Sequence, residues 1–187
     1  MTVKEIVALA SEFVGEKELA GKLRATDTVT YTTVEQEKIN LLTRAFNLVN
    51  QEIASDYLPF LKKEEVNVEG NILSFSALSK AVVNIYEVKN SFGKNLKFHV
   101  YSNYIEIDGK AKSVVYSYLP GDIALDGDVE MMNGLSARVY AYGIASEYLL
   151  IGGVSEDAEI WEERFKESLF VLSRKRGEHL MPKRGWF

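Results

Sequence analysis

Few residues in this sequence have the type and spacing that catalysis or metal binding requires. Glu147 is a charged residue in the middle of an apolar segment, and a buried carboxyl group of that kind can act as a general acid. The more ordinary interpretation is an ion pair with Arg138 or Arg164. His99 and His179 have no second ligand at metal-binding spacing, so we interpret both as structural or surface residues.

Sequence motifs for nucleotide binding and nucleophilic catalysis are also missing. None of the patterns GxSxG, GxxxxGK[ST] or GxGxxG occurs. The sequence has no cysteine, which excludes disulfide bonds, thiolate nucleophiles and cysteine-based metal sites. The acidic segment 122–130 resembles a calcium loop in composition, but it lacks the Asp-x-Asp-x-Asp-Gly spacing and the closing Glu. We therefore expect no catalytic residue, no metal site and no cofactor.

The clearest signal for binding lies in the last 14 residues, which read RKRGEHLMPKRGWF. Five basic residues against one Glu give this segment a net charge of +4, so the preceding 173 residues carry −9 and the whole chain −5. A terminal Trp-Phe pair exposes apolar surface unless a partner or the protein's own core covers it. We interpret residues 174–187 as a docking tail whose aromatic groups anchor it and whose basic groups meet an acidic rim. The predicted partner-binding residues are Arg174, Arg176, Pro182, Lys183, Arg184, Trp186 and Phe187.

Hydrophobic periodicity predicts helices on the N-terminal side of the chain. Residues 2–5 form a capping box before a first helix, whereas residues 25–32 are rich in β-branched and hydroxyl side chains that favour a loop. The strongest helical pattern starts at a second capping box, residues 33–36, and ends before Pro59.

Residues 135–151 are unusually apolar and contain small side chains that would let a neighbouring helix approach closely. We expect this segment to be the central, most buried helix. The small residues are Ala137, Ala141, Gly143, Ala145 and Ser146. Gly152 and Gly153 should end this helix, and Ser155 should cap a last one.

Between residues 65 and 119 the hydrophobic period changes to two. Turn signals at 69–71 and at Asp108-Gly109 predict two hairpins, over residues 66–75 and 104–118. Hairpin connections leave no room for crossover helices, so we expect one antiparallel sheet of about four to six strands.

These patterns predict an α+β fold, with a helical bundle from the N- and C-terminal helices and an antiparallel β insertion in the middle. We expect a helical core over residues 1–62 and 133–173, a β-subdomain over 63–122 and the docking tail over 174–187. With 47% hydrophobic and 26% charged residues, no apolar run long enough to cross a bilayer and no leader segment, the sequence is typical of a soluble cytoplasmic protein.

Several short motifs occur in a recognisable order from residue 33 to residue 187. They are IASDYLP at 53–59, YSYLP at 116–120, ASEY at 145–148, Ile160-Trp161 with Phe165, and PKRGW at 182–186. In this order the chain resembles the head-tail connector, or neck adaptor, proteins of tailed bacteriophages and prophages.

The resemblance implies a structural virion protein that is not an enzyme. It would reside in the host cytoplasm before assembly, where it can stay monomeric, and in the virion neck afterwards, as a homo-oligomeric ring of about twelve copies. Its partners would be the portal protein and tail or stopper proteins. DNA would pass through the ring lumen without sequence-specific binding, and no membrane would be involved.

Two other classes of function are open at this point. One is a cytoplasmic interaction or regulatory domain that binds a single partner through its tail. The other is a small enzyme that uses Glu147, with tyrosines of the β region lining a pocket.

Overall fold

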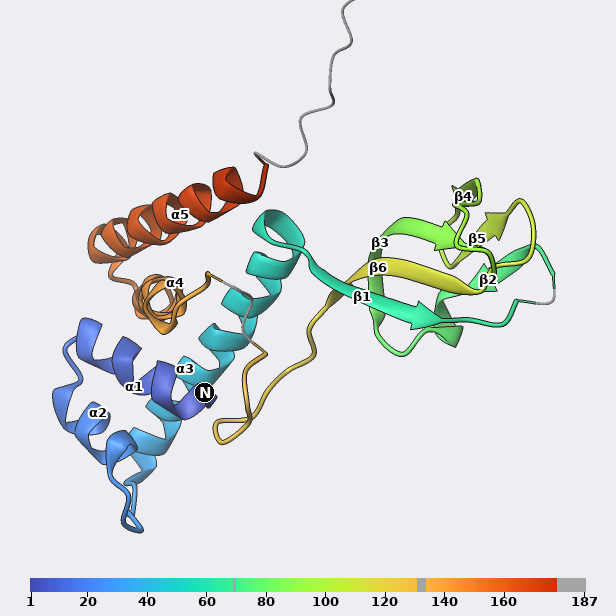
Figure 1. The fold of residues 1–187 in the computed structure, drawn as a ribbon. Coiled ribbons are helices and arrows are strands. Elements are labelled where there is room, and N and C mark those ends of the chain that lie inside the picture. Colours follow the sequence, from blue (N-terminus) through green and yellow to red (C-terminus); the bar gives the residue numbers. More distant parts are fainter. Residues whose placement is uncertain (69, 131–133, 178–187) are drawn as a thin grey trace, which may run out of the picture. The chain divides into compact units, whose positions relative to one another are not determined.

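The computed structural model describes residues 1–68, 70–130 and 134–177, with side chains up to residue 173 (Figure 1). Across these residues the fold is α+β, with five α-helices and two small antiparallel sheets. The chain divides into two compact parts. We call residues 1–52 and the described residues from 121 onward the helical unit, and the described residues of 53–120 the β unit.

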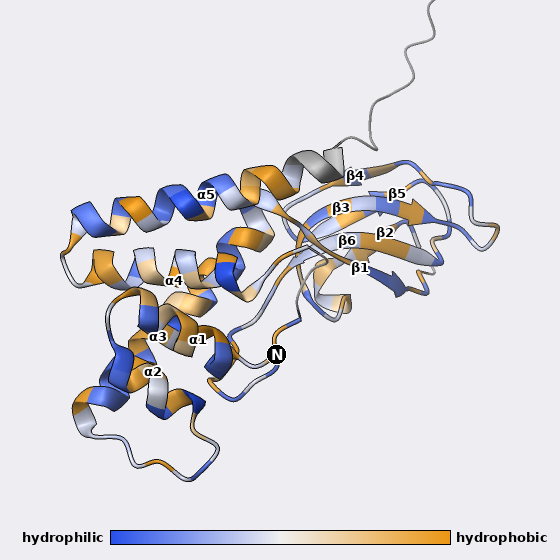
Figure 2. Ribbon diagram, turned by 60° about the vertical axis from the view of Figure 1, so that its left-hand side comes forward, coloured by the Kyte–Doolittle hydropathy of each residue, from blue (hydrophilic) through white to orange (hydrophobic). Residues whose placement is uncertain are grey.

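The helical unit combines helices from before and after the strands in sequence. Its elements are α1 (Val3–Phe13), α2 (Lys17–Arg24), α3 (Thr33–Glu52), α4 (Ala137–Ile151) and α5 (Ser155–Gly177). The predicted capping box of α1 is confirmed: the Thr2 hydroxyl accepts the N–H of Glu5 at 3.3 Å, and the Glu5 carboxylate accepts the N–H of Thr2 at 2.9 Å. In α5, hydrophobic and hydrophilic segments alternate, as expected of a helix with one face against a core (Figure 2).

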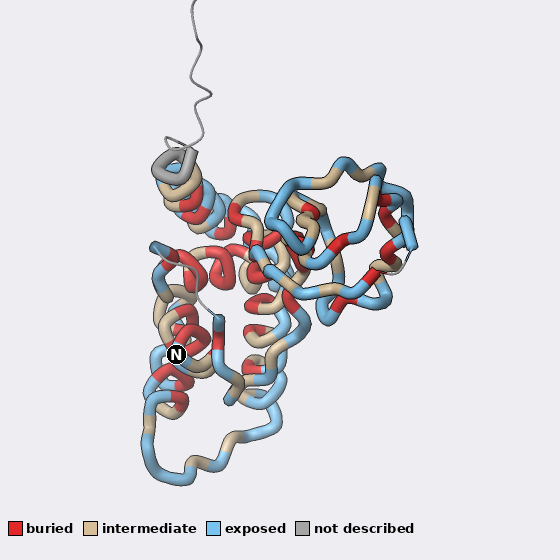
Figure 3. The backbone as a smooth tube through the Cα atoms, turned by 45° about the vertical axis from the view of Figure 1, so that its right-hand side comes forward, coloured by how far each residue is buried: buried red, intermediate tan, exposed pale blue. Residues whose placement is uncertain are grey.

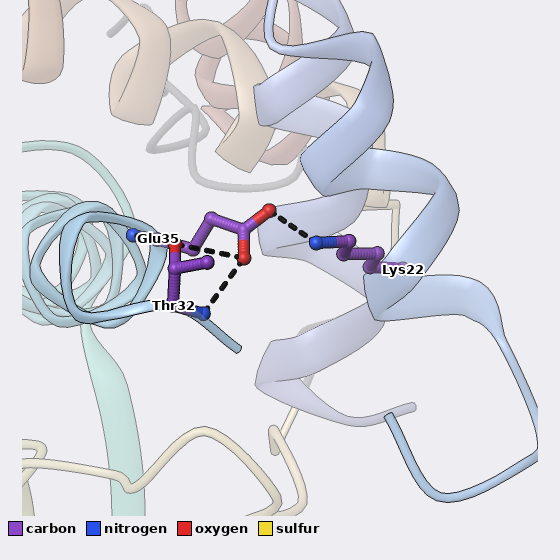
Figure 4. A network of polar contacts seen from close by, with 3 residues as sticks. All are labelled: Lys22, Thr32 and Glu35. Carbon is purple, nitrogen blue, oxygen red and sulfur yellow. Dashed lines mark hydrogen bonds and ion pairs between the residues drawn. The ribbon is translucent and has the colours of Figure 1, made fainter. Parts of the chain in front are cut away.

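The start of α3 differs by one residue from the predicted capping box at 33–36. Thr32 is the capping residue, and its N–H and hydroxyl both donate to the Glu35 carboxylate, at 2.9 and 3.0 Å. The same carboxylate accepts a hydrogen bond from Lys22 of α2 at 2.5 Å (Figure 4). A charged carboxylate is a stronger acceptor than the amide of Gln36, and only Glu35 reaches Lys22 as well. These contacts, led by Lys22, lower the pKa of Glu35 to about 2.

Helix α4 is the central helix of this unit, as predicted. It packs against α1, α3 and α5, and in Figure 1 it is seen almost end-on between α1 and α5. Buried residues concentrate on the facing sides of these helices (Figure 3). Tyr140 and Ile144 of α4 are fully buried, and the Tyr140 hydroxyl donates to the Asn50 side chain at 3.1 Å. Burial raises the pKa of Tyr140.

Gly143 makes this arrangement possible because α4 approaches its neighbours too closely for a larger side chain. A β-carbon at this position would lie 2.8 Å from Cγ1 of Val49 on α3 and 3.1 Å from Cε2 of Phe165 on α5. The predicted close approach to the backbone of this small-residue segment is therefore confirmed.

The β unit begins with a π-helical turn, Ile53–Tyr57, that ends before Pro59, and a short 3₁₀ helix, Phe75–Ala77, lies between its second and third strands. Its strands are β1 (Phe60–Glu65), β2 (Ile72–Ser74), β3 (Ala81–Lys89), β4 (Phe98–Val100), β5 (Tyr104–Ile107) and β6 (Ser113–Leu119). The strand order is β1-β6-β3 in one sheet and β2-β5-β4 in the other, and all pairs are antiparallel. Strand β1 thus starts within residues 1–62, the N-terminal segment that we expect in the helical core.

Both predicted hairpins and the prediction of a single sheet are wrong. The chain on either side of residues 69–71 goes to different sheets, because β1 pairs with β6 and β2 pairs with β5. Likewise β5 and β6, on either side of Asp108-Gly109, belong to different sheets. Here the backbone N–H of Asp108 donates to the Lys97 carbonyl at 2.9 Å, and that of Lys112 donates to the Lys89 carbonyl at 2.7 Å. These long-range bonds carry the chain from one sheet to the other, so the turn at Asp108-Gly109 does not join two paired strands.

We expect Gly143→Ala to destabilise the protein by about 1–3 kcal/mol, because the added methyl group overpacks the contact with Val49 and Phe165. Gly21→Ala is the matched control. It lies inside α2 with nothing within 4 Å of the added carbon, so it should stabilise by about 0.5–1 kcal/mol. Denaturant unfolding measures both. Equal effects of the two substitutions would contradict the close-packing account.

The Glu35 network predicts a pH dependence of stability. The folded-state pKa of about 2 lies below the ordinary value of 4.5, so the stabilisation is present above pH 4.5 and is lost as the pH falls towards 2. Unfolding measured across this window should show a steeper loss of stability for the unsubstituted protein than for Glu35→Gln. Lys22→Met, which keeps the carboxyl group but removes its main partner, should also flatten the curve. Parallel curves for all three proteins would contradict this assignment.

Candidate functional site

The predicted docking tail lies mostly outside the described residues. The backbone of Arg174 and Arg176 belongs to the last turns of α5, which ends at Gly177. Nothing is described for their side chains, or for the five predicted partner-binding residues of the segment 182–187. The predicted role of the tail therefore stays a prediction. The structure shows only that the first four residues of this segment belong to the end of α5.

Glu147 lies half-buried on α4. Among the described side chains, no ion pair joins it to Arg138 or Arg164, so the predicted pairing is wrong. Both guanidinium groups lie over aromatic rings instead. Arg138 is 5.9 Å from the centre of the Tyr142 ring, and Arg164 is 5.0 Å from that of Trp161. Such cation–π contacts hold an arginine without a carboxylate.

The acidic segment 122–130 serves as a structural connection to α1 and α3. The backbone N–H groups of Val3 and Lys4 donate to the carbonyls of Gly127 and Leu125, at 3.0 and 2.8 Å. The Asn47 side chain bonds both the carbonyl and the N–H of Ile123. Within the described residues no group of three or more His, Asp or Glu side chains could hold a metal ion.

Of the two histidines, His99 lies exposed on β4, and His179 is outside the described residues.

The β unit contains a closed polar network around a buried tyrosine. The hydroxyl of Tyr116 donates to the Glu64 carboxylate at 2.7 Å, and the Ser79 hydroxyl donates to the same carboxylate at 2.7 Å. Hydrogen bonds from Tyr116 and then Ser79 lower the pKa of Glu64, while burial raises the pKa of Tyr116. Because these groups satisfy one another, the network is suited to joining β1 and β6 to the segment before β3 rather than to binding a ligand.

An aromatic stack forms where α1, α4 and α5 meet. Phe13 ends α1, Tyr142 lies on α4 and Trp161 lies on α5. The centre of the Phe13 ring lies 4.9 Å from the centre of the Trp161 ring and 5.4 Å from that of Tyr142. The ring centres of Tyr142 and Trp161 are 5.6 Å apart. All three rings are stacked, with interplanar angles of 7° to 27°. The sequence does not indicate this stack, because its rings come from three helices, of which α1 is far from α4 and α5 in the chain.

A surface hollow of about 350 Å³ adjoins this stack. Its walls are mainly apolar, with one acidic and one basic side chain. The lining residues are Phe13, Val14, Leu149, Asp157, Ile160, Trp161 and Arg164. The volume lies near the lower end of the range for ligand sites, about 300–1,000 Å³, so the hollow has room for one aromatic side chain and its neighbour.

The start of α5 gives the rim of this hollow a negative charge. Five exposed acidic side chains occur between residues 155 and 163 with no basic residue among them. They are Glu156, Asp157, Glu159, Glu162 and Glu163. Only Glu162 is held in an ion pair among the described side chains, with Lys166. The site therefore suits a partner that offers an apolar side chain flanked by basic groups.

Comparison with known proteins adds no identification. No family model matches the sequence, and no curated protein matches it. In the part of the chain that the structure describes, no helix combines the length and apolar character needed to cross a bilayer.

We expect Trp161→Ala to destabilise the protein by about 2 kcal/mol, because Trp161 is half-buried and joins three helices through the stack. Ile160→Ala is the matched control. The neighbouring Ile160 side chain is 52% exposed, so its truncation should change stability by no more than about 0.5 kcal/mol. Thermal unfolding of both variants measures the difference. Equal values would show that the stack contributes nothing beyond surface burial.

Proposed function

We propose that this protein is a head-tail connector of a tailed bacteriophage or prophage. In this role it is a structural protein that assembles as a ring between the portal and the tail and docks through its C-terminal tail. The helices from the two ends of the chain act together as a bundle, and the strands form an insertion between them. The proposal rests on the order of sequence motifs described above and on the distribution of charge over the structure.

The charge distribution is the observation that carries this proposal. The helical unit up to residue 173 contains 19 acidic and nine basic side chains, and the β unit contains seven acidic and eight basic ones. The last 14 residues contain five basic residues and one acidic residue. The first four of them belong to the end of α5, a helix of 23 residues that spans about 34 Å. A basic, aromatic segment at the end of a long helix on an acidic body suits docking to an acid-rimmed pocket of another subunit.

The same charge distribution is compatible with DNA passage. A strongly acidic helical unit has no broad basic surface for phosphate binding, so a ring lumen formed by it would let DNA slide without sequence-specific contacts. The proposed partners are therefore proteins, namely the portal and the tail or stopper components.

A second candidate is an interaction or regulatory domain that binds one protein partner. The observation that favours it is the hollow beside the aromatic stack, which could receive a single side chain from a peptide. In that case the protein would bind its partner with a one-to-one stoichiometry and would not form a ring.

Removing the tail should abolish docking. We expect a chain ending at Leu172 to bind purified portal rings about 100-fold more weakly than the full chain, or not at all, because it lacks the predicted aromatic anchors. Complex mass measured by light scattering gives the readout.

A full-length variant with Lys183→Glu and Arg184→Glu tests the charge contribution. It should bind more weakly at low salt and lose less of its affinity as salt is added. Circular dichroism should show that both altered proteins keep the fold. If the chain ending at Leu172 bound portal rings as tightly as the full chain, the docking role of the tail would be refuted.

A further inference from the structure

The turn between β3 and β4 presents a phenylalanine to solvent on a well-fixed backbone. The side-chain oxygen of Asn90 accepts hydrogen bonds from the backbone N–H groups of Phe92 and Lys94, both at 3.0 Å. The backbone of Asn90 also bonds to Gly93 and Lys94, and Gly93 adopts a positive φ of 75°. Phe92 is nevertheless 92% exposed. A fixed backbone that holds a large apolar side chain in water indicates a contact with another molecule.

Basic side chains surround this turn. The β3–β4 connection lies beside the β5–β6 connection, because the Asp108 and Lys112 N–H groups donate to the carbonyls of Lys97 and Lys89. Five lysines therefore gather at this end of the β unit, at positions 89, 94, 97, 110 and 112.

Two of these lysines form ion pairs. Lys89 is paired with Glu87 at 2.5 Å, and Lys112 is paired with Glu65 at 3.7 Å. The other three lysines are exposed and make no ion pair among the described side chains. We call residues 90–97 the Phe92 loop.

The hollow on the helical unit has the complementary properties. Its walls include Leu149, Ile160 and Trp161, which suit an aromatic side chain, and its volume of about 350 Å³ is large enough to receive one. Asp157 lies in its wall, and the neighbouring acidic residues of α5 give its rim a negative charge. Arg164 is the one basic group in the wall, and it lies over the Trp161 ring.

We propose that the Phe92 loop of one copy docks into the hollow on the helical unit of a second copy. Phe92 enters the hollow, and Lys94, Lys97 and Lys110 face the acidic start of α5. The two surfaces differ, so each copy offers one of each and the contact is heterologous. A heterologous contact between identical chains produces a ring if the rotation closes. This contact deepens the proposed connector function by naming how neighbouring copies meet, and it does not use the C-terminal tail.

Cross-linking between two different single-cysteine variants tests this contact, because the native chain has no cysteine. One variant is Ser91→Cys, beside Phe92, and the other is Val154→Cys, just before α5 and 44% exposed. The two proteins are mixed at up to about 1 mM, where even weak pairs associate, and treated with a short bismaleimide. We expect a heterodimer that joins residues 91 and 154, identified by mass spectrometry of the linked peptides.

Matched variants show whether the link depends on the proposed contacts. Adding Phe92→Ala to the Ser91→Cys chain should lower the yield about tenfold or more, and adding Lys94→Glu with Lys97→Glu should lower it and weaken its salt dependence. Ile72→Cys is the positional control. It is an exposed residue of the same unit, at 61%, and should give no link to Val154→Cys.

No heterodimer at the highest concentration, or one that forms equally without Phe92, would overturn the proposal. A third protein carries both Ser91→Cys and Val154→Cys in one chain. If the link formed only in this protein, the proposal would also be overturned, because the loop would then occupy the hollow of its own chain. The chain ending at Leu172 should cross-link as the full chain does. If no cross-link formed between residues 91 and 154 but the full chain still bound portal rings, the contact between copies would be refuted and the connector function would remain.

Discussion

The helical unit depends on the close approach that Gly143 allows. With no side chain at this position, Val49 of α3 and Phe165 of α5 can both pack against the backbone of α4. Helix α4 thereby becomes the common neighbour of α1, α3 and α5. The same packing brings Phe13, Tyr142 and Trp161 into one stack and forms the hollow beside it. A glycine with no functional group thus determines where the aromatic stack and the hollow of this unit lie.

The functional interpretation depends on charge and exposed aromatic groups rather than on reactive side chains. The helical unit is acidic, whereas the C-terminal segment and the Phe92 loop combine basic residues with exposed or terminal aromatic ones. Two such segments on one chain would give each copy two ways of reaching an acid-rimmed apolar pocket. One would serve the contact between rings, and the other the contact between copies of the same ring.

Predictions from the sequence were correct where the structure depends on the residue types within a short segment. The capping box at Thr2 and the end of the helical region before Pro59 were predicted because each depends on residues a few positions apart. The close packing around Gly143 was predicted from the small side chains of one segment, although the neighbours that it meets lie far away in the sequence. The pairing of the strands was not, since the Asp108-Gly109 turn is governed by hydrogen bonds to Lys97 and Lys89. The aromatic stack was missed for the same reason, because its rings come from three helices. The predicted ion pair of Glu147 with Arg138 or Arg164 was wrong because both arginines lie over aromatic rings.

The measurement that tests the connector assignment most directly is native mass spectrometry of the protein mixed with purified portal rings at about 10 µM, a concentration that should saturate a specific contact. We expect one dominant species, whose mass equals the portal ring plus a fixed number of copies that matches a closed ring. Portal rings that stay unbound, or that carry a variable and unsaturated number of copies, would contradict it.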